Sequence, residues 1–259
     1  MTVSRSSIGW TDFSGGDLNF VLRGKKRGDC ECSAGCENCY AYVLRNRNRR
    51  QAADVTTYDA GKLTRLGRAR FPVDDRRRGP GSRPMCFVVD MGDLFHPRVP
   101  DDFVMQALAT MTARCDVDWQ VLTKRPARLA ALWGDVVPWP SHVWVGVTCE
   151  TQATARERLP YLREVPATVR YVSAEPLLEP MTLDLTGISW VICGGESGPG
   201  RRPFDKAWAR DLGGQCAKAG IPFFYKQGTA LRPGRDCILD GEEVKQWPMT
   251  APSSTFRLL

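Results

Sequence analysis

Long apolar runs are missing from this 259-residue sequence. Residues 1–10 contain no apolar core of signal-peptide length, and no later stretch approaches the roughly 20 apolar residues of a membrane span. Internal repeats are absent as well. We therefore expect a cytoplasmic protein that does not enter a membrane. Because 42% of the residues are hydrophobic, the chain can bury one substantial core.

Histidine is scarce, and the patterns that usually hold structural zinc are incomplete. The chain has only two histidines, with no His-x3-His pair and no second Cys-x2-Cys pair. Ten cysteines are present, but a disulfide framework is not expected in a reducing compartment. Six cysteines scattered among apolar segments are predicted to pack as small hydrophobes. They are Cys86, Cys115, Cys149, Cys193, Cys216 and Cys237.

The other cysteines gather in one loop, residues 30–39. Cys32, Cys36 and Cys39 form a C-x3-C-x2-C pattern, and a loop can wrap three such thiolates around one inorganic centre. Three thiolates on a [4Fe-4S] cluster leave one iron open to a small molecule. The spacing resembles the signature of radical S-adenosylmethionine (SAM) enzymes, and that resemblance implies that the open iron binds SAM and that reductive cleavage yields a 5′-deoxyadenosyl radical. A four-cysteine zinc site that includes Cys30, or plain thiols, are the alternatives.

Apolar runs alternate with helical patterns along most of the chain. Such alternation predicts parallel βα units, so we expect an α/β fold with a full or partly open (β/α) barrel. Clear strands are expected at residues 86–90, 119–123, 143–148, 169–173, 190–193 and 223–226, and weaker ones at 18–22 and 55–58. Helices are expected at residues 40–53, 62–70, 101–113, 126–133, 151–164 and 206–219. The 178–188 connection is short enough to lack a helix.

The end of the chain differs from the rest. An Asp240-Gly241 turn between apolar residues predicts a small hairpin within residues 237–247. We therefore divide the chain into a barrel, residues 1–227, and a C-terminal hairpin and tail, residues 228–259, packed on that barrel.

Polar residues follow the predicted strands. Carboxyl ends of parallel strands meet at one rim, where barrel active sites are built, and the cysteine loop shares that rim. Gly194 and Gly195 would let a ligand approach the backbone, and Glu196 offers a carboxylate to an ammonium or a ribose hydroxyl. A tight βα turn is the alternative for this segment. The further candidates for cofactor binding are Asp93, Lys124, Ser173 and Glu175, and salt bridges are the alternative role for the three charged ones.

The charge of the chain favours a polyanionic partner. The formal net charge is +7, and arginines are dense between residues 45 and 83. A solvated surface would explain the same arginines. The sequence thus allows a nucleotide or nucleic-acid substrate without requiring one.

Several motifs resemble one family across nearly the whole chain. They are Trp10-Thr-Asp, Gly35-Cys-Glu-Asn-Cys-Tyr-Ala, Met91-Gly-Asp-Leu-Phe-His, Leu122-Thr-Lys-Arg-Pro, Trp144-Val-Gly-Val-Thr, Ser173-Ala-Glu-Pro-Leu-Leu, Gly194-Gly-Glu-Ser-Gly-Pro, Phe223-Phe-Tyr-Lys-Gln and Leu239-Asp-Gly. Together they resemble the phage-associated three-cysteine-motif family of radical-SAM-like proteins, a domain of unknown function. The resemblance implies a barrel of radical SAM type but no substrate. The chain departs from the family at Cys30. Radical SAM enzymes often carry a Gly-Gly-Glu segment after the second strand, whereas Gly194-Gly-Glu here follows the seventh predicted strand.

Our first hypothesis is a radical SAM enzyme with a [4Fe-4S] cluster on Cys32, Cys36 and Cys39, acting on a nucleotide or nucleic-acid-derived substrate. Such an enzyme needs an electron donor such as flavodoxin or ferredoxin. The alternative is a non-catalytic iron-sulfur or zinc protein that binds nucleic acid. A third reading is non-radical use of SAM or a nucleotide. The reaction itself is unknown.

Overall fold

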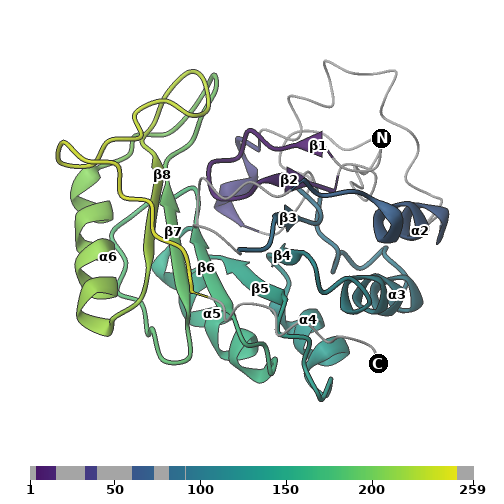
Figure 1. Ribbon diagram of the computed structural model, residues 1–259. Helices are drawn as coiled ribbons and strands as arrows, with labels where there is room; N and C mark the ends of the chain where they lie inside the picture. Colours follow the sequence, from purple (N-terminus) through teal and green to yellow (C-terminus); the bar gives the residue numbers. More distant parts are fainter. Residues whose placement is uncertain (1–3, 16–32, 40–59, 73–81, 91, 250–259) are drawn as a thin grey trace.

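The computed structural model describes residues 4–15, 33–39, 60–72, 82–90 and 92–249 (Figure 1). An eight-stranded sheet runs through the described chain in the order β1 to β8. Its strands are β1 (Ser4–Arg5), β2 (Phe13–Ser14), β3 (Met85–Phe87), β4 (Asp118–Thr123), β5 (Val143–Thr148), β6 (Arg170–Ala174), β7 (Trp190–Gly194) and β8 (Phe223–Gln227). β1 pairs antiparallel with β2, and every later pair is parallel. The seven parallel strands curl into a half-barrel.

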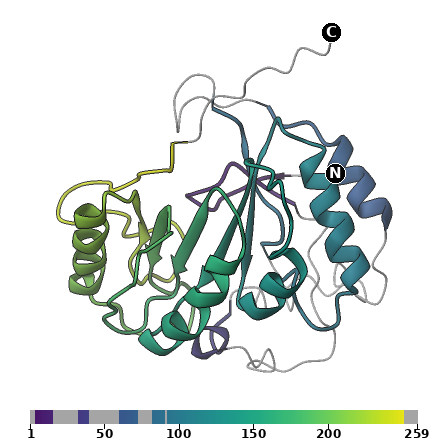
Figure 2. The same cartoon turned by 90° about the horizontal axis from the view of Figure 1, so that it is seen from below.

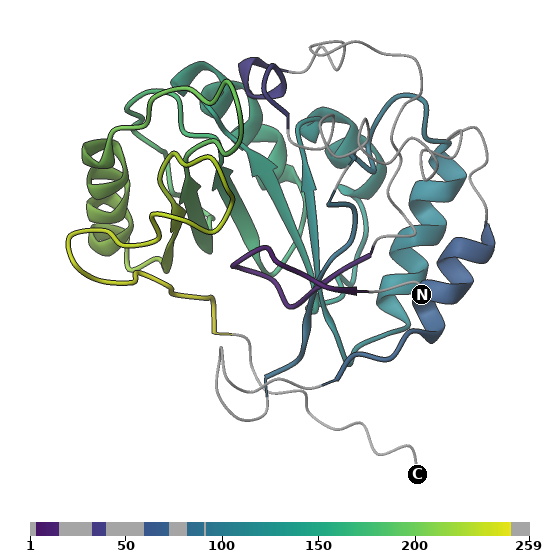
Figure 3. The ribbon, with the colours of Figure 1, turned by 90° about the horizontal axis from the view of Figure 1, so that it is seen from above.

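Helices cover the outer side of the curved sheet (Figure 3). The described α-helices are α2 (Ala60–Arg68), α3 (Asp101–Thr112), α4 (Pro126–Trp133), α5 (Gln152–Glu164) and α6 (Lys206–Ala219). The larger apolar core lies between these helices and the sheet. The α/β prediction is thus confirmed in its partly open form. As expected, the 175–189 connection carries no helix. No described helix is long and apolar enough to cross a bilayer.

The inner side of the half-barrel is filled by aromatic side chains. Trp10, from the turn between β1 and β2, lies 4.9 Å from Phe87, 6.3 Å from Tyr171 and 6.2 Å from Trp190 between ring centroids. Alternate residues of β3 and β5 to β8 join this second core. Gly146 leaves the space that the Tyr171 ring occupies, since a Cβ there would lie 2.5 Å from that ring. The half-barrel is therefore a packed body, and its free surface for chemistry is the rim.

The amino-terminal part of the sheet differs from the strands that we expected there. The 18–22 and 55–58 strands and the 40–53 helix lie outside the described residues. Two short strands that we did not expect, β1 and β2, begin the sheet. The third described strand ends at Phe87, so the expected extension to Asp90 is wrong. Beyond Phe87 the backbone still bonds to β4 through Val88, whose N–H donates to the Gln120 carbonyl at 3.0 Å.

The C-terminal segment lies along the last strand. Asp240 and Gly241 have positive φ values of 53° and 90°, and Leu239 and Glu242 exchange backbone hydrogen bonds of 2.9 and 3.1 Å. The predicted Asp-Gly turn is therefore present. Further on, Lys245 pairs antiparallel with Phe224 of β8, which protects that edge of the sheet.

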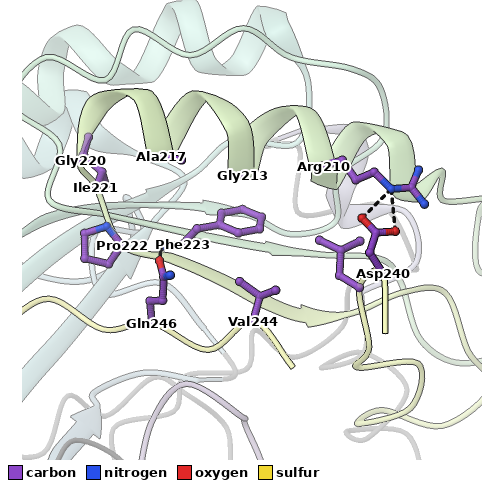
Figure 4. A pocket seen from close by; sticks show the side chains of 11 residues that line it. Arg210, Gly213, Ala217, Gly220, Ile221, Pro222, Phe223, Asp240, Val244 and Gln246 are labelled. Carbon is purple, nitrogen blue, oxygen red and sulfur yellow. Dashed lines mark hydrogen bonds and ion pairs between the residues drawn. The ribbon is translucent and has the colours of Figure 1, made fainter. Parts of the chain in front are cut away.

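A groove of about 630 Å³ lies between α6 and this C-terminal segment (Figure 4). Glycine, alanine and apolar residues form most of its wall, and at one end Arg210 Nε donates to both carboxylate oxygens of Asp240 at 2.8 Å. Its lining residues are Arg210, Gly213, Ala217, Gly220, Ile221, Pro222, Phe223, Leu239, Asp240, Val244 and Gln246. None of these is a candidate site residue from the sequence, so the groove is separate from the rim.

Candidate functional site

The polar strand ends meet at one rim and pair with one another. Lys124, after β4, forms an ion pair with Glu150, after β5. Lys226, in β8, forms an ion pair of 2.8 Å with Glu175, after β6. These pairs link neighbouring or nearby strands, as the parallel register requires. The predicted gathering of polar residues at one rim is therefore present.

One side of the cysteine loop is docked on Glu150. This carboxylate is fully buried, and it accepts hydrogen bonds from the Ser33 hydroxyl, from Lys124 and, at 2.9 Å, from Arg158 of α5. A Cβ added to Gly35 would lie 2.5 Å from the Glu150 Oε1 atom. Only glycine fits there without displacing the carboxylate. The loop backbone is thus held directly against the end of β5, next to the start of α5 (Figure 2).

The other side of the loop is docked on Glu196 and Arg202. Asn38 donates to Glu196 at 3.1 Å and to the Gly200 carbonyl at 2.8 Å. Arg202 donates to Glu196, at 2.7 Å from its backbone N–H, and its guanidinium donates to the Ala34 carbonyl at 2.9 Å. Two carboxylates at different strand ends therefore anchor one short loop from opposite sides.

The described part of the cysteine loop is a single 3-10 turn, η2 (Ala34–Cys36). Cys36 is buried and Cys39 half-buried, and the Cys39 N–H donates to the Cys36 carbonyl at 3.3 Å. Cys30 and Cys32 lie outside the described residues. Within the described ranges, no group of three metal-ligating side chains occurs, so the full ligand set stays a prediction.

The residues present fit an iron-sulfur group as far as they are described. Two thiols three residues apart lie on one turn, and thiolates are the donors that such clusters take. The carboxylates nearest the loop, Glu150 and Glu196, are already paired with cations. They therefore act on the loop as anchors and leave the thiols as the donor groups.

The charge states of the two anchors follow from their surroundings. Burial alone would raise the pKa of Glu150, but Lys124, Arg158 and the Ser33 hydroxyl together hold it below its usual value. Burial likewise opposes ionisation of Glu196, while hydrogen bonds from Arg202 and Asn38 lower its pKa overall. Both groups are carboxylates at neutral pH.

The predicted SAM residues Gly194, Gly195 and Glu196 have structural partners in the rim. A Cβ on Gly194 would lie 2.9 Å from Glu175 Oε1, and one on Gly195 would lie 2.9 Å from the Gly228 and Thr229 backbone. Gly194 is thus required by the close approach of the Glu175 side chain after β6, and Gly195 by the chain after β8. Glu196 is occupied by Arg202 and Asn38. Residues 195–205 connect β7 to α6, so the connection is longer than the tight βα turn given as the alternative for this segment.

Glu175 and Ser173 come together beneath the rim. Glu175 accepts hydrogen bonds from Trp10 Nε1 at 3.1 Å and from the Ser173 hydroxyl at 3.2 Å, besides its ion pair with Lys226. The Lys226 and Glu175 side chains are 26% and 12% exposed, so a ligand at the rim can reach this pair. Ser173 and Glu175 are thus two predicted cofactor residues that lie together, with Lys226, and bind none of the described loop residues.

Asp93 has a structural environment. It accepts from the Thr123 hydroxyl at 2.8 Å and from Arg125 at 2.8 Å, and also from the backbone N–H groups of Phe95 and Lys124. Four donors satisfy this carboxylate and fix the turn after β4. The rim histidine, His96, accepts the Arg98 N–H at 3.1 Å.

Sequence reasoning missed Ser33, Asn38, Arg158 and Arg202, which dock the loop, and Trp10, which orients Glu175. Of these residues, only Arg158 could have been noticed in the sequence, because its spacing places it on the apolar face of the helix with Ala155 and Leu159. In the structure it is 1% exposed. The loop residues follow no periodicity, so their partners depend on which strand ends the fold brings together.

Fold and site together define a class: an α/β half-barrel whose cysteine-bearing loop is anchored by carboxylates at the carboxyl ends of its strands. Residues 6–247 match the family described as protein of unknown function (DUF5131), and the chain belongs to that family. No curated protein and no solved structure matches the chain.

Proposed function

We propose that this protein is a radical SAM enzyme that holds a [4Fe-4S] cluster on Cys32, Cys36 and Cys39 and acts on a nucleotide or nucleic-acid-derived substrate. The observation that supports it most is the double anchoring of the cysteine loop at the rim of a parallel half-barrel. When bound, the cluster supplies the electron for reductive cleavage of SAM to a 5′-deoxyadenosyl radical.

The residues of the chain have separate roles in this proposal. Glu150 and the Glu196–Arg202 pair fix the backbone of the loop from both sides. The Glu175–Lys226 pair offers a carboxylate and an ammonium to the oppositely charged groups of SAM or substrate. Trp10 and Ser173 orient Glu175 by donating to its Oε2 atom. The aromatic inner core, which includes Trp10, keeps water away from the buried side of the Glu175–Lys226 pair.

The proposal is tested with anaerobically reconstituted full-length protein. Iron and sulfide content are measured first, and then SAM and dithionite are added and 5′-deoxyadenosine is quantified. We expect the product from the wild-type protein and from Cys115→Ala, which removes an exposed cysteine remote from the loop motif. The Cys36→Ala variant is expected to form none.

A zinc-containing wild-type protein, or an iron protein that binds SAM without forming 5′-deoxyadenosine, would contradict the proposal. Zinc held by four cysteines would instead favour the non-catalytic nucleic-acid-binding alternative, because that alternative needs the metal only to shape the loop.

A further inference from the structure

Two loops beyond the strand ends lie side by side, and the first of them contacts the cysteine loop. One follows β7, residues 195–205, and the other follows β8, residues 228–238. Ser197 and Ala230 form a parallel bridge between them, and the Gly198 N–H donates to the Ala230 carbonyl at 3.0 Å. The first loop also contacts the cysteine loop, because Gly200 accepts from Asn38. These two loops therefore form one surface continuous with the proposed reaction site. We name it the arginine rim.

The carboxylates of the arginine rim are already engaged. Glu196 pairs with Arg202, and Asp236 pairs with Lys206 at 2.6 Å. Asp205 caps α6 by accepting the Ala207 N–H at 2.8 Å. Each acidic group in the two loops thus has a partner.

Three guanidinium groups of the same surface have no acidic partner among the described residues. Arg232 and Arg235 are exposed, and Arg201 makes a single long hydrogen bond of 3.4 Å to the Gly198 carbonyl. The Arg201 Nε atom is buried and finds no acceptor in the described part of the chain. Guanidinium groups without an acidic partner among the described residues suit an anionic ligand with several acceptor oxygens.

The shape of the second loop favours an extended ligand over a small one. Arg232 and Arg235 are separated by Pro233 and by Gly234, which has a φ of 72°, and Leu231, next to Arg232, is 65% exposed. The exposed Leu231 side chain can pack against the apolar face of a base while the neighbouring guanidinium groups pair with phosphate. A single phosphate would leave part of this surface unused.

We propose that the arginine rim binds the phosphodiester backbone of a single-stranded nucleic acid and presents it to the cysteine loop. The proposal deepens the proposed function by naming the substrate class of that site and the residues that hold it. Binding requires neither SAM nor reductant, so it is measured separately from radical chemistry, and either proposal can fail alone.

The test is the salt dependence of binding by reconstituted full-length protein. Fluorescence anisotropy with labelled single-stranded DNA and RNA of one sequence gives the dissociation constant at several salt concentrations. For single strands the logarithm of affinity falls by about 0.7 per phosphate contact for each tenfold rise in salt. We therefore expect the Arg232→Ala, Arg235→Ala double variant to lose about 1.4 from the slope with at least one of the two strands.

The matched control is Lys218→Ala, an exposed cation near the carboxyl end of α6, at the opposite end of the sheet from the rim. It should retain the wild-type slope. An unchanged slope in the double variant, or no binding to either strand at low salt, would overturn the proposal. Equal competition by inorganic phosphate and by unlabelled oligonucleotide, matched in phosphate concentration, would also overturn it, because the surface would then take single phosphates.

Discussion

A buried carboxylate, Glu150, is the residue on which the cysteine loop depends most. It neutralises Arg158, which is 1% exposed, and it binds Lys124 and Ser33. An uncompensated buried charge is expensive, so this carboxylate stabilises the rim and the loop together. The same group that fixes the fold locally therefore fixes the position of Cys36.

We expect Glu150→Gln to lower the free energy of unfolding by about 3 kcal/mol, because it leaves Arg158 and Lys124 without their countercharge. Urea denaturation at pH 7 measures the loss. The control is Glu157→Gln on the exposed side of α5, which should change stability by no more than about 0.5 kcal/mol. Equal effects of the two substitutions would show that Glu150 contributes no special charge compensation.

The lowered pKa of Glu150 also fixes the direction of the pH dependence. In the unfolded chain a glutamate titrates near about pH 4.3, and above that pH the ionised group contributes its full stabilisation. As the pH falls through the lower pKa of the folded state, that contribution is lost. Between pH 7 and pH 3 the free energy of unfolding should therefore fall further for the wild type than for Glu150→Gln. Urea denaturation at each pH measures it.

Elements with a strong apolar pattern were predictable, and short ones were not. Strands β4 to β8 follow from continuous apolar runs, since they are buried by helices on one side and by aromatic residues on the other. β1 and β2 have two residues each, too few to show a period, and they form because Trp10 anchors the turn between them. The rim charges were visible as strand-end residues, but their pairing required the spatial order of the strands.

Substitutions at Gly214, inside α6, and at Gly220, its C-cap, test where this helix ends. Gly220 stops the helix in the left-handed region with a φ of 68°, whereas Gly214 is inside it with open space around an added Cβ. We expect Gly220→Ala to destabilise the protein by about 1 kcal/mol and Gly214→Ala to stabilise it by about 0.8 kcal/mol. Thermal unfolding measures both. Changes of the same sign would contradict the assigned helix end.

The six scattered cysteines differ in burial: Cys86, Cys149, Cys193 and Cys216 are buried, Cys237 is half-buried and Cys115 is exposed. Burial raises the pKa of Cys149 and of Cys216 to about 12, and it also raises the pKa of Cys193, so these thiols stay protonated near neutral pH. Cys115 is exposed. The sequence-based expectation that scattered cysteines pack as small hydrophobes is met by the buried members but not by Cys115.

We expect native protein at pH 8 to react with iodoacetamide rapidly at Cys115 and slowly at Cys149, Cys193 and Cys216, as followed by mass spectrometry of peptides. Denatured protein should react at all four sites, which is the control for intrinsic reactivity. Rapid native labelling of Cys193 would mean that the sheet opens far more often than its packing implies, since both the residue and its strand are buried.

The strands occupy the sheet in the same order as they occur along the chain. The ribosome therefore synthesises the cysteine loop well before the carboxylates that anchor it. Ser33 precedes Glu150 by 117 residues, and Asn38 precedes Glu196 by 158. During translation the cysteine loop therefore lacks its contacts with Glu150 and Glu196 until the second half of the polypeptide has been made. The cluster that we propose would accordingly be inserted late, after translation, and nascent chains truncated before β5 should acquire no stable cluster.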